Sequence, residues 1–197
     1  LITRAGRSEI GKIVIPLGND FFNVDNWQGT TARGTRVDST DDRFAKVFSV
    51  GLDATRDVVL RCREIAPVEV LYIPGNHDPA TSWYLCKTLA EYFRGSQASD
   101  VSVDLSPKKR KYRDYGNSLL GWTHGNFERA ADLPLIMAQE APEAFAKARF
   151  KTWHTGHFHK SKETRYTAGD TFNGVSVVIL PSLCGTDGYH YDNGWST

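Results

Sequence analysis

The chain has 197 residues, and its 24 lysines and arginines nearly balance 23 aspartates and glutamates, giving a formal net charge of +1. Near-neutral charge argues against a protein that coats nucleic acid by bulk attraction. Three scattered cysteines exclude a disulfide scaffold and a thiolate zinc cluster. No apolar run is long enough to span a bilayer, so we expect no membrane partner. The few cysteines, together with the lack of a signal-peptide pattern and of an Asn-x-Ser/Thr sequon, favour a reducing, cytoplasmic setting.

Strand-like and helix-like segments alternate along the chain. Short β-branched runs that end at glycine or proline predict strands, and apolar residues at three- and four-residue steps predict amphipathic helices. These patterns predict, in order, strand 12–17, helix 44–65, strand 68–73, helix 81–93, a weaker strand 101–105, strand 118–123, helix 133–149 interrupted near Pro142, strand 150–155 and strand 175–180.

This order of elements favours an α/β fold in which helices cover a sheet. The sequence contains no internal repeat, no low-complexity segment and no linker. We therefore expect a single domain over residues 1–197.

Polar clusters follow four of the predicted strands. Ligand sites in layered α/β folds gather where strands end in loops, so these clusters are expected to share one crevice. The clusters are Gly18-Asn19-Asp20, Gly75-Asn76-His77-Asp78, His124-Gly125-Asn126 and Gly156-His157-Phe158-His159. Imidazole, carboxylate and carboxamide ligands together suit Mn, Fe or Zn.

These clusters resemble four of the five motifs of the calcineurin-like metallophosphoesterases, and they occur in that family's order. The pair Gly-Asn-His-Asp and Gly-His-x-His carries most of the resemblance, which spans residues 12 to about 181. It implies a four-layer α/β/β/α sandwich of mixed sheets. It also implies two divalent metal ions at the strand ends, with Mn expected first and Fe or Zn as alternatives.

The resemblance also implies a role for each site residue. Asp20 would bridge the two metals, and His159 would bind the second of them. Asn76, His124 and His157 would complete the first metal's ligands. His77 would act as general acid or transition-state donor, and Asp78 would orient it.

One motif of the family, an Asp-x-His on its first strand, is absent before Asp20. We therefore expect the domain to lack its N-terminal first strand. Either that motif lies upstream of Leu1, which we favour, or the metal site is incomplete by nature. Within this chain the second metal site keeps only Asp20 and His159, and it is expected to be incomplete.

The predicted function is a metal-dependent phosphoesterase with a phosphate-ester substrate, leaning to a nuclease-like phosphodiesterase that acts on DNA. The alternative is a non-catalytic scaffold of the same fold that binds a protein or nucleic-acid partner. The basic run from Lys108 to Arg113 could meet a nucleic-acid backbone or be a solvated hairpin. Asp25, Asn26 and Trp27 could line a substrate cleft. Tyr189 and His190 could contact substrate or lie in a surface loop. We interpret His154 as structural or as a residue that supports a metal ligand.

Overall fold

A computed structural model describes residues 10–37, 43–157, 169–172 and 174–180. The fold is mixed α/β, with two sheets and, among the described residues, four α-helices and one 3₁₀ helix. The chain divides into two compact units, residues 1–108 and 109–197. The single-domain expectation stays a prediction.

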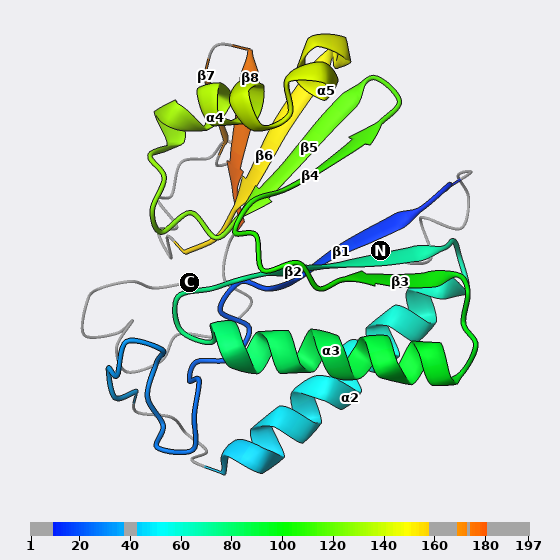
Figure 1. Cartoon of the computed structure of the whole chain (residues 1–197), viewed down its shortest axis with the longest axis vertical. Coiled ribbons are helices and arrows are strands. Elements are labelled where there is room, and N and C mark those ends of the chain that lie inside the picture. Colours follow the sequence, from blue (N-terminus) through cyan, green and yellow to red (C-terminus); the bar gives the residue numbers. More distant parts are fainter. Residues whose placement is uncertain (1–9, 38–42, 158–168, 173, 181–197) are drawn as a thin grey trace. The chain divides into compact units, whose positions relative to one another are not determined.

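The first unit is a parallel sheet with two helices on one face (Figure 1). Its strands are β1 (Ile13–Gly18), β2 (Val68–Ile73) and β3 (Val101–Asp104), in the order β1-β2-β3. Helices α2 (Phe44–Arg63) and α3 (Pro79–Gly95) connect them. Parallel neighbours place the carboxyl ends of β1 and β2 at the same edge, where both polar clusters of this unit begin.

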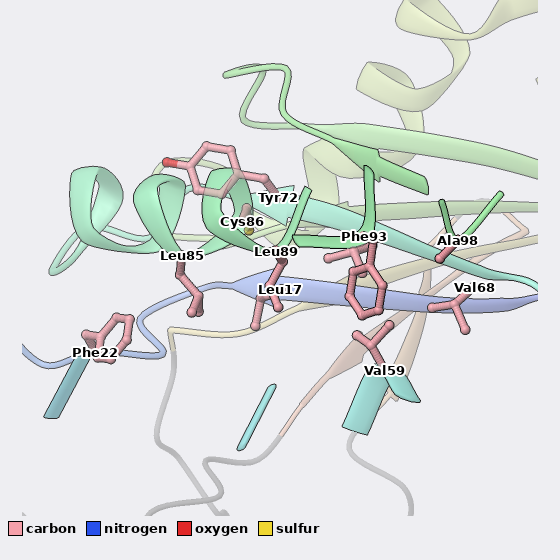
Figure 2. Close-up of a cluster of buried hydrophobic side chains, with 11 residues drawn as sticks. Leu17, Phe22, Val59, Val68, Tyr72, Leu85, Cys86, Leu89, Phe93 and Ala98 are labelled. Atoms are coloured by element: carbon pink, nitrogen blue, oxygen red, sulfur yellow. The ribbon is translucent and has the colours of Figure 1, made fainter. Parts of the chain in front are cut away.

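The core of the first unit lies between its sheet and helices, and Figure 2 shows the apolar side chains that meet there. Alternate β2 residues, among them Val68 and Val70, face α3, which contributes Leu85 and Leu89. Both leucines are fully buried. Burying each one contributes about 1.5–3 kcal/mol, so the core holds the strand ends rigidly.

The second unit is a five-stranded mixed sheet covered on one face by short helices (Figure 1). The strand order is β4-β5-β6-β8-β7, with β5, β6 and β8 parallel and the two outer strands antiparallel. The elements are β4 (Lys111–Tyr115), β5 (Ser118–Thr123), η1 (Ala130–Asp132), α4 (Leu133–Glu140), α5 (Pro142–Lys147), β6 (Phe150–Thr155), β7 (Gly169–Phe172) and β8 (Val175–Ile179).

Trp153 of β6 is the largest fully buried side chain of the second unit. It packs with Leu119 and Met137, and its indole N–H donates to the carbonyl of Leu133 at 3.0 Å. This bond satisfies the one polar atom of the ring, so α4 is fixed over the sheet without an unpaired donor.

Every predicted strand is present within two residues of its expected bounds, and the helices differ mainly at their ends. The predicted helix 133–149 is two helices, because the residue before Pro142 leaves the helical region at φ −133°. Strands β4 and β7 were not predicted. No helix in the described part of the chain combines the length and the apolarity that crossing a bilayer requires.

Candidate functional site

The loop after β1 holds Asp20 in a tight left-handed turn. Gly18, Asn19 and Asp20 have φ values of 100°, 59° and 64°. The Asn19 N–H donates to the carbonyl of Ile73 at the end of β2, at 2.8 Å. Left-handed backbone is unfavourable for residues other than glycine, and such strain concentrates at functional sites.

A hydrogen bond joins the β1 loop to the Gly75-Asn76-His77-Asp78 segment that follows β2. The His77 backbone N–H donates to Asp20 Oδ1 at 2.8 Å. The bond fixes one oxygen of the Asp20 carboxylate against the segment that follows β2. Asp20, Asn76 and His77 are all partly exposed, so their side chains are within reach of a ligand.

Asp78 makes a second connection between the same two loops, and its side chain is fully buried. Its Oδ2 accepts the Phe22 N–H at 2.7 Å and also the Ser82 hydroxyl. Burial raises the pKa of the Asp78 carboxyl to about 7, although both hydrogen bonds act to lower it. Asp78 thus holds the β1 loop against the start of α3.

Two polar atoms of this segment are buried without a hydrogen-bond partner among the described residues. They are Nδ1 of His77 and Oδ1 of Asp78. Nearly all buried polar atoms in native proteins are paired, and each exception calls for an explanation such as an absent ligand or a catalytic role.

Asp25 and Ser82 support the segment, and the sequence analysis missed both of these roles. The Asp25 carboxylate accepts the N–H groups of Ala80 and Thr81, at 3.3 and 2.7 Å, and thereby caps α3. Ser82 lies four residues after Asp78, a spacing that puts both side chains on one face of a helix start. That spacing was the signal available in the sequence for Ser82, whereas the Asp25 contact spans 56 residues.

In the second unit the structure brings His124 and His157 together. Nε2 of His124 lies 3.1 Å from Nδ1 of His157, and the ring centroids are 4.9 Å apart. The two residues follow β5 and β6, which are parallel neighbours. The Gly156 N–H donates to the His124 carbonyl at 3.0 Å, and His157 adopts a left-handed φ of 62°.

The His154 side chain is half-buried against an aromatic neighbour. Its ring stacks on Trp122, with centroids 5.7 Å apart and an interplanar angle of 18°. Burial lowers the pKa of the imidazole, which favours its neutral form. Its Nδ1 has no hydrogen-bond partner in the described part of the chain.

Cationic side chains of the basic run at 108–113 bind other side chains of the same unit. The Arg110 guanidinium binds Glu140 through two nitrogens and Glu128 through a third, at 2.6–3.0 Å. Lys109 lies 3.8 Å from the ring centroid of Phe127, and Lys111 is buried. The run therefore offers less cationic surface than its sequence suggests.

The structure thus groups the predicted residues within each unit. Asp20, Asn76, His77 and Asp78 lie at adjoining strand ends of the first, and His124 and His157 form the pair in the second. His159, Tyr189 and His190 lie outside the described residues.

The ring nitrogens of His124 and His157 are placed so that they fit a divalent metal ion. Metal–nitrogen bonds are about 2.0–2.1 Å long, so two imidazole nitrogens 3.1 Å apart can bind the same ion. Imidazoles are suitable ligands for Mn, Fe or Zn. His124 and His157 are both able to serve as ligands here.

Comparisons of the chain with protein-family models, with curated proteins and with solved structures found no match.

Proposed function

We propose that this protein is a metal-dependent phosphoesterase that hydrolyses phosphodiesters, similar to the calcineurin-like metallophosphoesterases. The observation that carries the proposal is the approach of His124 and His157, whose ring nitrogens are 3.1 Å apart. A pair of imidazoles in this arrangement is the most specific chemical feature of the described residues. It falls on two of the four motifs on which the resemblance depends.

In the proposed site, Asp20, Asn76, His124 and His157 bind one divalent ion. Asp20 and His159 contribute to a second, with Mn as the expected metal. The hydrogen bond from the His77 backbone to Asp20 supports this assignment, because it fixes the orientation of a carboxylate, a ligand type that suits Mn.

The proposed reaction is attack of a water molecule on phosphorus, with cleavage of the bond to the leaving oxygen. When bound, the divalent ions neutralise the phosphate charge and lower the pKa of water. His77 gives a proton to the leaving oxygen. The proton that the attacking water loses goes to solvent, and His77 regains one from solvent, so the proton balance closes. Asp78 positions His77 by holding its segment against the β1 loop and α3.

We propose that the two sheets form the middle layers of an α/β/β/α sandwich. Val68 and Val70 face the helices of the first unit, so alternation directs Leu71 and Ile73 to the opposite face. In the second unit Leu119 faces α4, which directs Trp122 to the other face. A sheet with large apolar side chains on both faces needs a cover on each.

The scaffold alternative is disfavoured by the buried carboxyl of Asp78. Burying an ionisable group with one unpaired oxygen costs stability, and a protein that only binds a partner gains nothing from it. An active site has a use for such a group as the support of a proton donor.

The test is hydrolysis of the chromogenic diester bis(p-nitrophenyl) phosphate by the full-length protein, with Mn²⁺ and with EDTA. We expect Mn²⁺-dependent turnover that His77→Ala lowers by about 10²–10⁴-fold in kcat while Mn²⁺ still binds. His154→Asn is the matched histidine control and should retain the wild-type kcat per folded molecule. Turnover that persists in EDTA, or in His77→Ala at the wild-type rate, would rule out the proposal.

A further inference from the structure

We infer that Trp27, supported by Phe44, is a stacking platform for a nucleobase of a single-stranded nucleic acid. The inference rests on the proposed function, whose substrate class it narrows from phosphodiesters in general to base-bearing ones. It comes from the loop 25–37 of the first unit.

Trp27 is unusually exposed for its size. Its exposed fraction is 72%, the highest among the large apolar side chains of the described residues. The indole contacts the Phe44 ring, with centroids 5.1 Å apart and an interplanar angle of 54°. The contact orients the indole while most of its surface stays in water, where apolar area is costly unless a partner covers it.

The turn that carries Trp27 is held by its own hydrogen bonds. Asn26 Oδ1 accepts the N–H groups of Gln28 and Thr30, at 3.0 and 3.2 Å, and its amide donates to the Thr30 hydroxyl at 2.6 Å. The Asp25 N–H donates to the Thr30 carbonyl at 2.8 Å. Because the turn is already ordered, stacking a ligand on Trp27 requires little further loss of backbone entropy.

The same loop is attached to the candidate catalytic segment at two points. Asp25 caps α3 through the N–H groups of Ala80 and Thr81. The Ala32 N–H donates to the His77 carbonyl at 2.9 Å. Trp27 is thereby fixed on a loop that is anchored on both sides to the segment containing the proposed proton donor.

The charge of the loop complements a phosphate backbone. Arg33 and Arg36 are both exposed in it. A positive surface beside an exposed aromatic ring is the combination by which proteins bind single strands without reading their sequence.

The test compares binding of two labelled oligonucleotides of about ten nucleotides, oligodeoxythymidine and a strand of the same length with abasic sites. Both carry the same phosphates, so the ratio of their affinities isolates the bases. The wild-type chain, in EDTA to prevent cleavage, is expected to prefer the base-bearing strand by about tenfold. Oligouridine should bind with an affinity similar to that of oligodeoxythymidine, because the indole stacks on the base and does not contact the sugar.

Trp27→Ala should abolish that preference, and Trp27→Tyr should restore much of it. Tyr84→Ala is the matched control, since Tyr84 is also aromatic and is 59% exposed on α3. It should bind both strands as the wild type does. Equal binding of the two strands by the wild-type chain, or an unchanged preference in Trp27→Ala, would overturn the inference.

Failure of the platform and failure of the proposed function give different results. If the chain hydrolyses bis(p-nitrophenyl) phosphate with Mn²⁺ but shows no base preference, the platform is wrong and the phosphoesterase stands. If the base preference depends on Trp27 but no diester is hydrolysed, the base-binding surface stands and the catalytic proposal is wrong.

Discussion

Oδ1 of Asp20 lies 2.8 Å from the backbone nitrogen of His77, whose N–H it accepts. The bond joins two loops whose residues are 57 positions apart in sequence. It places a proposed metal ligand and a proposed proton donor in one rigid group, because Asp78 also binds the β1 loop through the Phe22 N–H. Disturbing this group should therefore affect stability and chemistry together.

Gly75→Ala should break this arrangement. A methyl group at Gly75 would overlap Oδ1 and the backbone nitrogen of Asp20 and would come within 2.9 Å of Asp78 Oδ1. We expect a loss of about 1–3 kcal/mol in the free energy of unfolding, measured by urea titration, together with weaker Mn²⁺ binding.

Gly95→Ala provides the control for that substitution. Gly95 ends α3, and a methyl group there would meet no atom within 4 Å. It should change the unfolding free energy by less than about 0.5 kcal/mol and leave Mn²⁺ binding intact. Equal effects of the two substitutions would mean that close packing around Asp20 is unimportant.

Asp78→Asn should change how stability depends on pH in metal-free protein. The carboxyl has a pKa of about 7 in the fold and an ordinary value of 3.8 when exposed, because burial disfavours its charged form. Between these values the folded chain keeps the proton and the unfolded chain loses it. Ionisation therefore favours unfolding, and stability falls as pH rises through this window, by up to about 1.4 kcal/mol per pH unit.

Asn cannot ionise, so the stability of the Asp78→Asn variant should not show the fall with rising pH that ionisation of Asp78 causes. Urea unfolding in EDTA at several pH values from about 4 to about 7 measures the slope. Asp53→Asn, at an aspartate with 62% side-chain exposure that pairs with Arg56 at 3.0 Å, shows the effect of removing an exposed carboxylate and its ion pair. The account is wrong about the buried carboxyl if Asp78→Asn and the wild type lose stability in parallel across this range.

Arg110→Met should destabilise the second unit. The Glu128 side chain is 5% exposed, and its Oε1 accepts from the Arg110 guanidinium at 2.8 Å. Removing the cation leaves a buried carboxylate uncompensated, which typically costs about 3 kcal/mol. Adding Glu128→Gln should recover a large part of the loss.

Arg129→Met is the matched control for Arg110, because Arg129 pairs with Asp132 at 2.8 Å while its side chain is 84% exposed. Exposed ion pairs contribute little, so we expect a change below about 0.5 kcal/mol. If the two arginine variants unfold at the same urea concentration, the buried pair has no special role.

The sequence was sufficient to predict most strands and the grouping of polar residues at their ends, because both follow from local patterns. Strand β4 was missed since its letters, Lys-Tyr-Arg-Asp-Tyr, lack an apolar alternation. It is stabilised by contacts that no local pattern reveals, such as the Tyr112 hydroxyl bound to Glu140, 28 residues away.

In the candidate site, too, features that follow from local patterns were predictable, and contacts between distant segments were not. The spacing of motifs predicted that His124 and His157 would lie near each other, and the parallel pairing of β5 and β6 brings them together. The roles of Asp25 and Phe22 were beyond sequence reasoning. Both contacts join segments more than fifty residues apart, and in both of them a backbone N–H donates to a carboxylate.

The metal centre is the central claim, and calorimetric titration of Mn²⁺ into the 197-residue chain tests it most directly. The account predicts saturable binding that His157→Ala and His124→Ala each abolish or weaken by about 10-fold or more. His77→Ala and His154→Asn should bind Mn²⁺ as the wild type does. Absence of Mn²⁺, Fe²⁺ and Zn²⁺ binding by the folded wild-type chain, or undiminished binding by His157→Ala, would contradict it.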